Sequence, residues 1–219
     1  YIGPWLPEPL LLEPNDASAD VVLAESVSMA MLVVLETLSP DERAVFVLRE
    51  VFGCSHDEIA STIEKSPAAV RQMAHRAREH VRARRKRFGD VDPQRSTQIT
   101  AQFLATAASG DVEALMAMLA PDATWMADSG GKVSAARRPV VGADKVARAI
   151  TGLVRKAGTG TRVELVTCNS APTVLFYLDD ELAMVITLEI ADDKITNFYV
   201  MRNPDKLAAV ATARDISRG

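Results

Sequence analysis

The stretch SPAAVRQMAHRAREHVRARRKR, residues 66–87, decides how the first part of this chain folds. On a helix, apolar side chains recur in it every three or four residues and form one stripe: Val70, Met73, Ala77 and Val81. Arginine, glutamine and histidine side chains occupy the remaining faces. We therefore expect a helix that packs on a core along one side and presents cationic and polar groups along the other.

The charge of this stretch contrasts with that of the whole chain. Residues 66–87 hold eight Lys or Arg and a single acid, Glu79, whereas the 219-residue chain has a formal net charge of −4. Local charge decides what binds locally, whatever the net value. The cationic stretch is either a solvated helix face or a surface for nucleic-acid phosphates, and the sequence before it separates the two interpretations.

Capping signals divide residues 20–88 into four helices. The first covers the apolar run Asp20–Leu38, Ser39 caps the second, and Gly53 ends it. A short third helix starts near Ser55, and Ser66, followed by proline, caps the basic helix. A short helix, a tight turn and a capped basic helix form a helix-turn-helix arrangement, whose second helix enters the DNA major groove N-terminus first. We therefore favour DNA binding over a solvated face.

Exposed positions of the basic helix suit contacts with bases and phosphates. Arginine pairs with guanine and glutamine with adenine, which makes these residues candidates for base edges: Arg71, Gln72, His75 and Arg76. Ser66 and the free amides at the helix start can meet a phosphate. The basic cluster at the end of the helix adds sequence-independent phosphate contacts: Arg82, Arg84, Arg85, Lys86 and Arg87.

The pattern changes after a Gly- and Pro-containing boundary at residues 88–93. Helical patterns continue to about residue 120, a short strand follows at 124–128, and another helix at 142–158. Four strand-like runs then cover 161–202, with tight turns at Asp179-Asp180 and Asp192-Asp193, and a helix closes the chain from residue 203. This order predicts an α+β domain over 96–219, with helices packed into one face of a curved antiparallel sheet.

The first 19 residues are rich in proline but also apolar, with Trp5 and several leucines, including Leu6. We expect an extended inter-domain linker that lies against a surface, because a freely flexible linker would be polar.

No apolar run reaches the roughly 20 residues of a membrane-spanning helix, and no signal peptide is visible. Cys54 and Cys168 have no CxxC spacing or clustered histidines, so we expect no metal site, cofactor or disulfide, and a reducing compartment such as the cytoplasm.

The run LSPDERAVFVLREVFGCSHDEIASTIEKSPAAVRQMAHRARE, residues 38–79, resembles region 4 of extracytoplasmic-function (ECF) sigma factors. The resemblance implies that this all-α domain recognises the −35 promoter element and contacts core RNA polymerase. It places the DNA contacts at Ser66, Ala69, Arg71, Gln72, His75 and Arg76. Gln72 and Met73 stand where many members have Ser and Arg, so the promoter sequence does not follow from the family.

Three motifs resemble those of the ECF subgroup with a SnoaL-like C-terminal extension (SigJ-type): YIGPWLPEP at residues 1–9, DSGGKV at 128–133 and NPDKL at 203–207. Ser129 stands where the subgroup commonly has Gly. The resemblance spans all 219 residues and implies a SnoaL-like (NTF2-like), cone-shaped, curved-sheet domain that regulates sigma activity in cis. It also implies that the sequence starts in the linker between regions 2 and 4, without region 2, and that the protein acts in stress responses.

Asp128 is the obvious candidate for a catalytic base in residues 96–219, which contain no histidine. Its alternative role is to bond the backbone of the glycine turn that follows it. We favour the second role and expect no enzymatic activity. A SnoaL-type enzyme fused to a DNA-binding module, and a repressor that acts without polymerase, stay as alternatives.

Two hypotheses concern the C-terminal domain. In the first, Trp5, Leu6 and Pro7 dock on that domain near the glycine loop and the NPDKL motif and so fix the orientation of region 4. The residues involved are Asp128, Gly130, Gly131, Lys132, Asn203, Pro204, Asp205, Lys206 and Leu207. In the second, the SnoaL-like pocket binds a small apolar ligand that shifts the domain arrangement; the sequence names no ligand.

Overall fold

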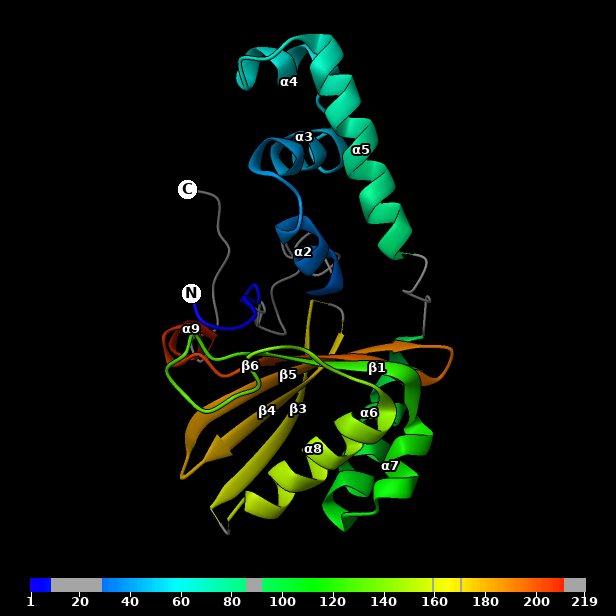
Figure 1. The fold of residues 1–219 in the computed structure, drawn as a ribbon, viewed down its shortest axis with the longest axis vertical. Helices are drawn as coiled ribbons and strands as arrows, with labels where there is room; N and C mark the ends of the chain where they lie inside the picture. Colours follow the sequence, from blue (N-terminus) through cyan, green and yellow to red (C-terminus); the bar gives the residue numbers. More distant parts are fainter. Residues whose placement is uncertain (9–28, 86–91, 159, 170, 211–219) are drawn as a thin grey trace. The chain divides into compact units, whose positions relative to one another are not determined.

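The computed structural model describes residues 1–8, 29–85, 92–158, 160–169 and 171–210 (Figure 1). The chain divides into two compact units. One is formed within residues 30–88, and the other combines residues 1–29 with 89–219. The domain limits expected at residues 19, 20, 88 and 96 stay predictions, since residues 9–28 and 86–91 lie outside the described part.

The first unit is helical, and its last three helices start where the caps predict. They are α2 (Met29–Glu36), α3 (Pro40–Glu50), α4 (His56–Thr62) and α5 (Pro67–Arg85). Ser39 and Ser55 each form a capping box with the glutamate three residues later, Glu42 and Glu58. The predicted helix over 20–38 is confirmed for its described end, and its residues 20–28 lie outside the described part.

The core of the helical unit confirms the predicted stripe. Val70, Met73, Ala77 and Val81 are each less than a tenth exposed. Val70 and Met73 pack with residues of α3 and α4, chiefly Val45, Ile59 and Ala60. The apolar side of α5 is therefore used inside the unit, and its other faces remain for solvent or a partner.

The second unit is built around a six-stranded sheet. Its strands are β1 (Leu119–Asp128), β2 (Val140–Val141), β3 (Thr161–Cys168), β4 (Ala171–Leu178), β5 (Glu181–Ala191) and β6 (Lys194–Met201), in the order β2-β1-β6-β5-β4-β3. Its helices are α6 (Pro93–Ser109), α7 (Val112–Met118), α8 (Ala143–Lys156) and α9 (Pro204–Val210). In Figure 1, α6, α7 and α8 lie together against the sheet, and α9 lies apart from them.

Two features of the sheet differ from the sequence prediction. The sheet is mixed, because β1 pairs parallel with β6, whereas we expected only antiparallel pairs. The strand expected at 124–128 starts earlier, at Leu119. The added residues are extended because Leu119 also pairs with the distant β6, and the register of this pairing shifts between Leu119 and Thr124. The turns at Asp179-Asp180 and Asp192-Asp193 are confirmed, with φ between 49° and 64° at all four residues.

The core between the helices and the sheet is aromatic at its centre. Phe198 on β6 is fully buried and lies 5.3 Å from the ring of Phe103 and 5.5 Å from that of Trp125, centroid to centroid. Pairing of β1 with β6 brings their carboxyl ends together, with Asp128 opposite Met201. This places the glycine loop that follows β1 next to α9.

No helix in the described part combines the length and apolar character needed to cross a membrane.

Candidate functional site

The exposed face of α5 carries the residues predicted to contact DNA. Arg71, Gln72, His75 and Arg76 are all exposed. Within the described residues, Arg71, Gln72 and His75 make no hydrogen bond or ion pair with other side chains. Arg76 donates its Nε–H to Glu42 of α3 over 2.9 Å, and this hydrogen bond is the main cause of a lowered pKa at Glu42.

The start of α5 has a local structural role. The Ser66 hydroxyl accepts the Ala69 amide over 3.2 Å, so it caps the helix. Ala69, in the first turn of α5, is half-buried against the helical core. At the other end, Arg82 pairs with Glu79 over 3.3 Å, and the side chains of residues 84–87 lie outside the described part.

A second site forms around Asp128, at the end of β1. Its carboxylate is fully buried and accepts four donors from three parts of the chain. Oδ2 accepts the Leu6 amide over 2.9 Å and the Lys206 ammonium over 2.7 Å. Oδ1 accepts the Gly130 amide over 3.1 Å and the Tyr1 hydroxyl. A buried carboxylate is stable only when it is paired and hydrogen-bonded in this way.

Lys206 on α9 completes the pair and reaches the first residues of the chain. It is 8% exposed, and its Nζ also donates to the Leu6 carbonyl over 2.6 Å. The ammonium lies 3.9 Å from the centre of the Trp5 ring, a cation–π contact. Asn203, at the start of α9, donates to the Tyr1 hydroxyl over 3.0 Å. We call Asp128, Asn203 and Lys206 the linker clamp, and residues 1–8 the linker segment.

The linker segment lies beside α9 (Figure 1) and is partly buried there. Leu6 is 1% exposed and Pro7 is also buried, whereas Trp5 is 44% exposed. Because Leu6 gives both its N–H and its C=O to the clamp, its backbone is fixed by charge-assisted hydrogen bonds. The structure thus brings together the residues that the docking hypothesis named.

The glycine loop fits tightly against both neighbours. Gly130 and Gly131 have φ of +57° and +77°, a left-handed conformation that disfavours other residues. A Cβ on Gly130 would lie 2.7 Å from Nδ2 of Asn203, and one on Gly131 would lie 2.9 Å from Cβ of Ile2. Small size at both positions is therefore needed for the linker segment and α9 to approach.

The remaining motif residues support the clamp from outside. Lys132 and Asp205 form an exposed ion pair between the glycine loop and α9. Pro204 is the first residue of α9, and Leu207 is buried.

Sequence reasoning missed Tyr1, although it lies in the quoted YIGPWLPEP motif, and did not predict that Asp128 and Lys206 pair. Partial burial and the adjacent carboxylate raise the pKa of the Tyr1 phenol to about 12, so it remains a donor at neutral pH.

The geometry argues against Asp128 as a catalytic base. Each of its oxygens already accepts two hydrogen bonds, and the side chain has no exposed surface. A general base needs to reach a substrate proton directly or through one water. Asp128 is instead placed as a structural anchor, which includes the predicted bond to the glycine turn.

Comparison with known proteins identifies the family. The family model for sigma-70 region 4 matches residues 28–81. The chain is 38% identical over 218 residues to the ECF RNA polymerase sigma factor SigJ of Mycobacterium tuberculosis, covering 94% of this chain and 70% of SigJ. It is 33% identical over 206 residues to the probable ECF sigma factor SigI of the same species, covering 94% of this chain and 68% of SigI.

This chain belongs to the ECF sigma factor family. A crystal structure of M. tuberculosis SigJ superposes with a TM-score of 0.75 at 34% identity and covers 95% of this chain and 76% of that one. The expected fold, a region 4 helix-turn-helix unit followed by an α+β SnoaL-like domain with a curved sheet, is confirmed.

Lys206→Met tests the clamp of this sigma factor. The change leaves the Asp128 carboxylate buried without its counter-charge, so we expect the free energy of unfolding to fall by about 3–5 kcal/mol. Urea unfolding followed by tryptophan fluorescence measures the loss. Asp205→Asn, at the preceding, exposed position of α9, removes only a surface pair and should cost less than about 1 kcal/mol. Equal losses for the two variants would contradict a buried clamp.

Gly131→Ala tests the fit of the linker segment, with Gly110→Ala as a matched control. Gly110 has nearly the same φ, +74°, but a Cβ added to it would meet no atom within 4 Å. Both variants should lose about 1–2 kcal/mol from the left-handed backbone. Only Gly131→Ala meets Ile2, so only it should speed hydrogen exchange of the Leu6 amide, measured by mass spectrometry. Unchanged exchange in Gly131→Ala would mean that the close approach does not hold the linker segment.

Proposed function

We propose that this sigma factor binds promoter DNA through α5 and directs core RNA polymerase to promoters with a matching −35 element. The observation that carries the proposal is the division of α5 into two sides. Its apolar stripe is buried in the region 4 core, whereas Arg71, Gln72 and His75 are exposed. Side chains in this arrangement are available for base edges when a recognition helix enters the major groove.

Arg76 joins these contacts at small cost. Its pair with Glu42 lies at the surface, where an ion pair is worth at most about 1 kcal/mol. A DNA phosphate carries a full negative charge and offers several acceptor oxygens, so it competes well for the guanidinium. The pair with Glu42 therefore orients Arg76 in the free protein without blocking its use on DNA.

We further propose that the linker clamp regulates sigma activity in cis. The linker segment precedes region 4 in the chain, and the SnoaL-like domain follows region 4. When the linker segment is fixed to the SnoaL-like domain, fewer orientations are open to region 4, so region 4 loses less entropy when it binds its partners. The saturated Asp128 carboxylate supports this role over a fused SnoaL-type enzyme, because this candidate base has no exposed surface and each of its oxygens already accepts two hydrogen bonds.

Arg71→Ala tests DNA recognition. A lost bidentate contact to a base costs about 1–3 kcal/mol, so we expect weaker binding and relaxed preference at one base pair. Selection of bound duplexes from a random pool, followed by sequencing and by fluorescence anisotropy over a series of salt concentrations, measures both effects. Arg148→Ala, an exposed arginine on α8, is the control and should change neither. A sequence preference and affinity unaltered by Arg71→Ala, or an affinity independent of salt, would contradict the proposed interface.

Run-off transcription tests cis regulation. The complete gene product is combined with core polymerase, and Gly131→Ala is compared with Gly110→Ala. We expect lower output from Gly131→Ala because freeing the linker segment removes the preorganisation of region 4. Matched output from the two variants, at equal DNA affinity, would reject cis regulation by the clamp and leave the DNA-binding proposal intact.

A further inference from the structure

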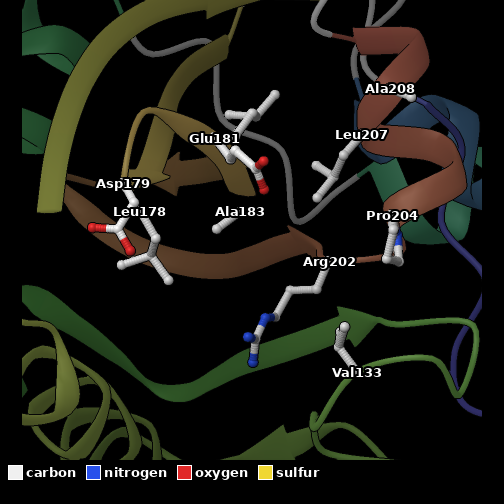
Figure 2. A pocket seen from close by; sticks show the side chains of 10 residues that line it. Val133, Leu178, Asp179, Glu181, Ala183, Arg202, Pro204, Leu207 and Ala208 are labelled. Carbon is white, nitrogen blue, oxygen red and sulfur yellow. The ribbon is translucent and has the colours of Figure 1, made fainter. Parts of the chain in front are cut away.

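A cavity of about 820 Å³ lies at one end of the C-terminal sheet. It is open to solvent on one side and is lined by the β4–β5 hairpin, the residue that follows β6, the start of α9 and the end of the glycine loop (Figure 2). This volume is within the range of pockets for small molecules. Most of its wall is apolar, formed by Val133, Leu178, Leu182, Ala183, Pro204, Leu207 and Ala208.

Arg202 is the cationic residue among those that line this cavity, and no acid of the described residues balances its charge. The side chain is half-buried, and its one hydrogen bond within the described residues runs from an Nη atom to the Ser134 carbonyl over 2.5 Å. Nε is closed to solvent without a hydrogen-bond partner, and no carboxylate of the described residues pairs with the guanidinium. Burial lowers the pKa of Arg202, which shows that the charge is poorly solvated.

The two acids of the cavity do not supply the missing charge. Asp179 and Glu181 are exposed at the rim, on the hairpin, where water screens them. In Figure 2 the Arg202 guanidinium lies between Val133 on one side and Leu178 with Asp179 on the other. A half-buried cation between the apolar side chains of Val133 and Leu178, with only an exposed acid nearby, favours an anionic head group attached to an apolar body.

We infer that this cavity binds a small amphipathic monocarboxylate. Its carboxylate pairs with Arg202, and its aliphatic or aromatic body packs on Leu178 and Leu207. The exposed acids at the rim select against ligands of higher negative charge, such as phosphates. Asp128, whose carboxylate is fully buried in the clamp, and Lys132, which pairs with Asp205, take no part.

The cavity and the linker clamp share their backbone. The Arg202 amide donates to the Asp128 carbonyl over 2.7 Å, and α9 presents Lys206 to the clamp and Leu207 to the cavity. A bound ligand therefore touches the same helix that holds the linker segment. Any control of transcription through this site rests on the proposed cis regulation, whereas the binding itself does not.

Titration calorimetry on this chain tests the inference, with decanoate as the probe and decanol, decylamine and inorganic phosphate as comparisons. We expect decanoate to bind about tenfold more tightly than decanol, because a charge-assisted hydrogen bond adds more than about 1.4 kcal/mol. Decylamine and phosphate should bind more weakly still. Arg202→Gln should remove the preference for decanoate over decanol, and Ala183→Leu, which fills the cavity, should weaken both ligands about tenfold or more.

Arg162→Gln, an exposed arginine on β3 outside the cavity, is the matched control and should leave both affinities unchanged. Circular dichroism checks that each variant is folded. If Arg202→Gln does not fold, the affinities for decanoate and decanol, measured on the unaltered chain and on Ala183→Leu, still test the inference. No binding of decanoate, equal affinity for decanoate and decanol, or affinity that survives Ala183→Leu would overturn the inference. Because binding is measured directly, none of these results affects the transcription test of the clamp.

Discussion

The buried ion pair between Asp128 and Lys206 is the constraint on which the C-terminal unit depends. A carboxylate without exposed surface is costly unless its oxygens are fully hydrogen-bonded, and here they accept from Leu6, Gly130, Tyr1 and Lys206. These donors come from the first residues of the chain, the glycine loop and α9. One buried charge thus joins three segments that are far apart in sequence, which explains why each carries a motif.

Region 4 handles charge in the opposite way. On α5 the apolar stripe supplies the packing, and the basic residues stay at the surface, where they keep their hydration until a partner replaces it. Exposed pairs such as Arg76 with Glu42 contribute little stability, so they can be exchanged for phosphate contacts. The buried pair fixes a structure, whereas the exposed charges remain available for binding.

In the SnoaL-like domain, the fold by itself does not determine the chemistry of the site. Its core is filled by the side chains around Phe198, and the Asp128 carboxylate at the end of β1 is closed off by the clamp. At the end of the sheet lies a cavity whose guanidinium has no counter-charge among the described residues, next to the helix that holds the linker segment. Function in such a domain follows from these particular side chains and not from the fold class.

The sequence by itself determined the helices of region 4, the stripe of α5 and the two-residue turns of the meander, because caps, periodicity and turn residues act over a few neighbouring positions. It also marked the motifs of the linker segment, glycine loop and α9. Only the tertiary structure decided that β1 runs parallel to β6, that Asp128 pairs with Lys206 and Tyr1, and that Arg202 lacks a counter-charge among the described residues. Those features depend on contacts between residues up to 127 positions apart, where no local pattern specifies the partner.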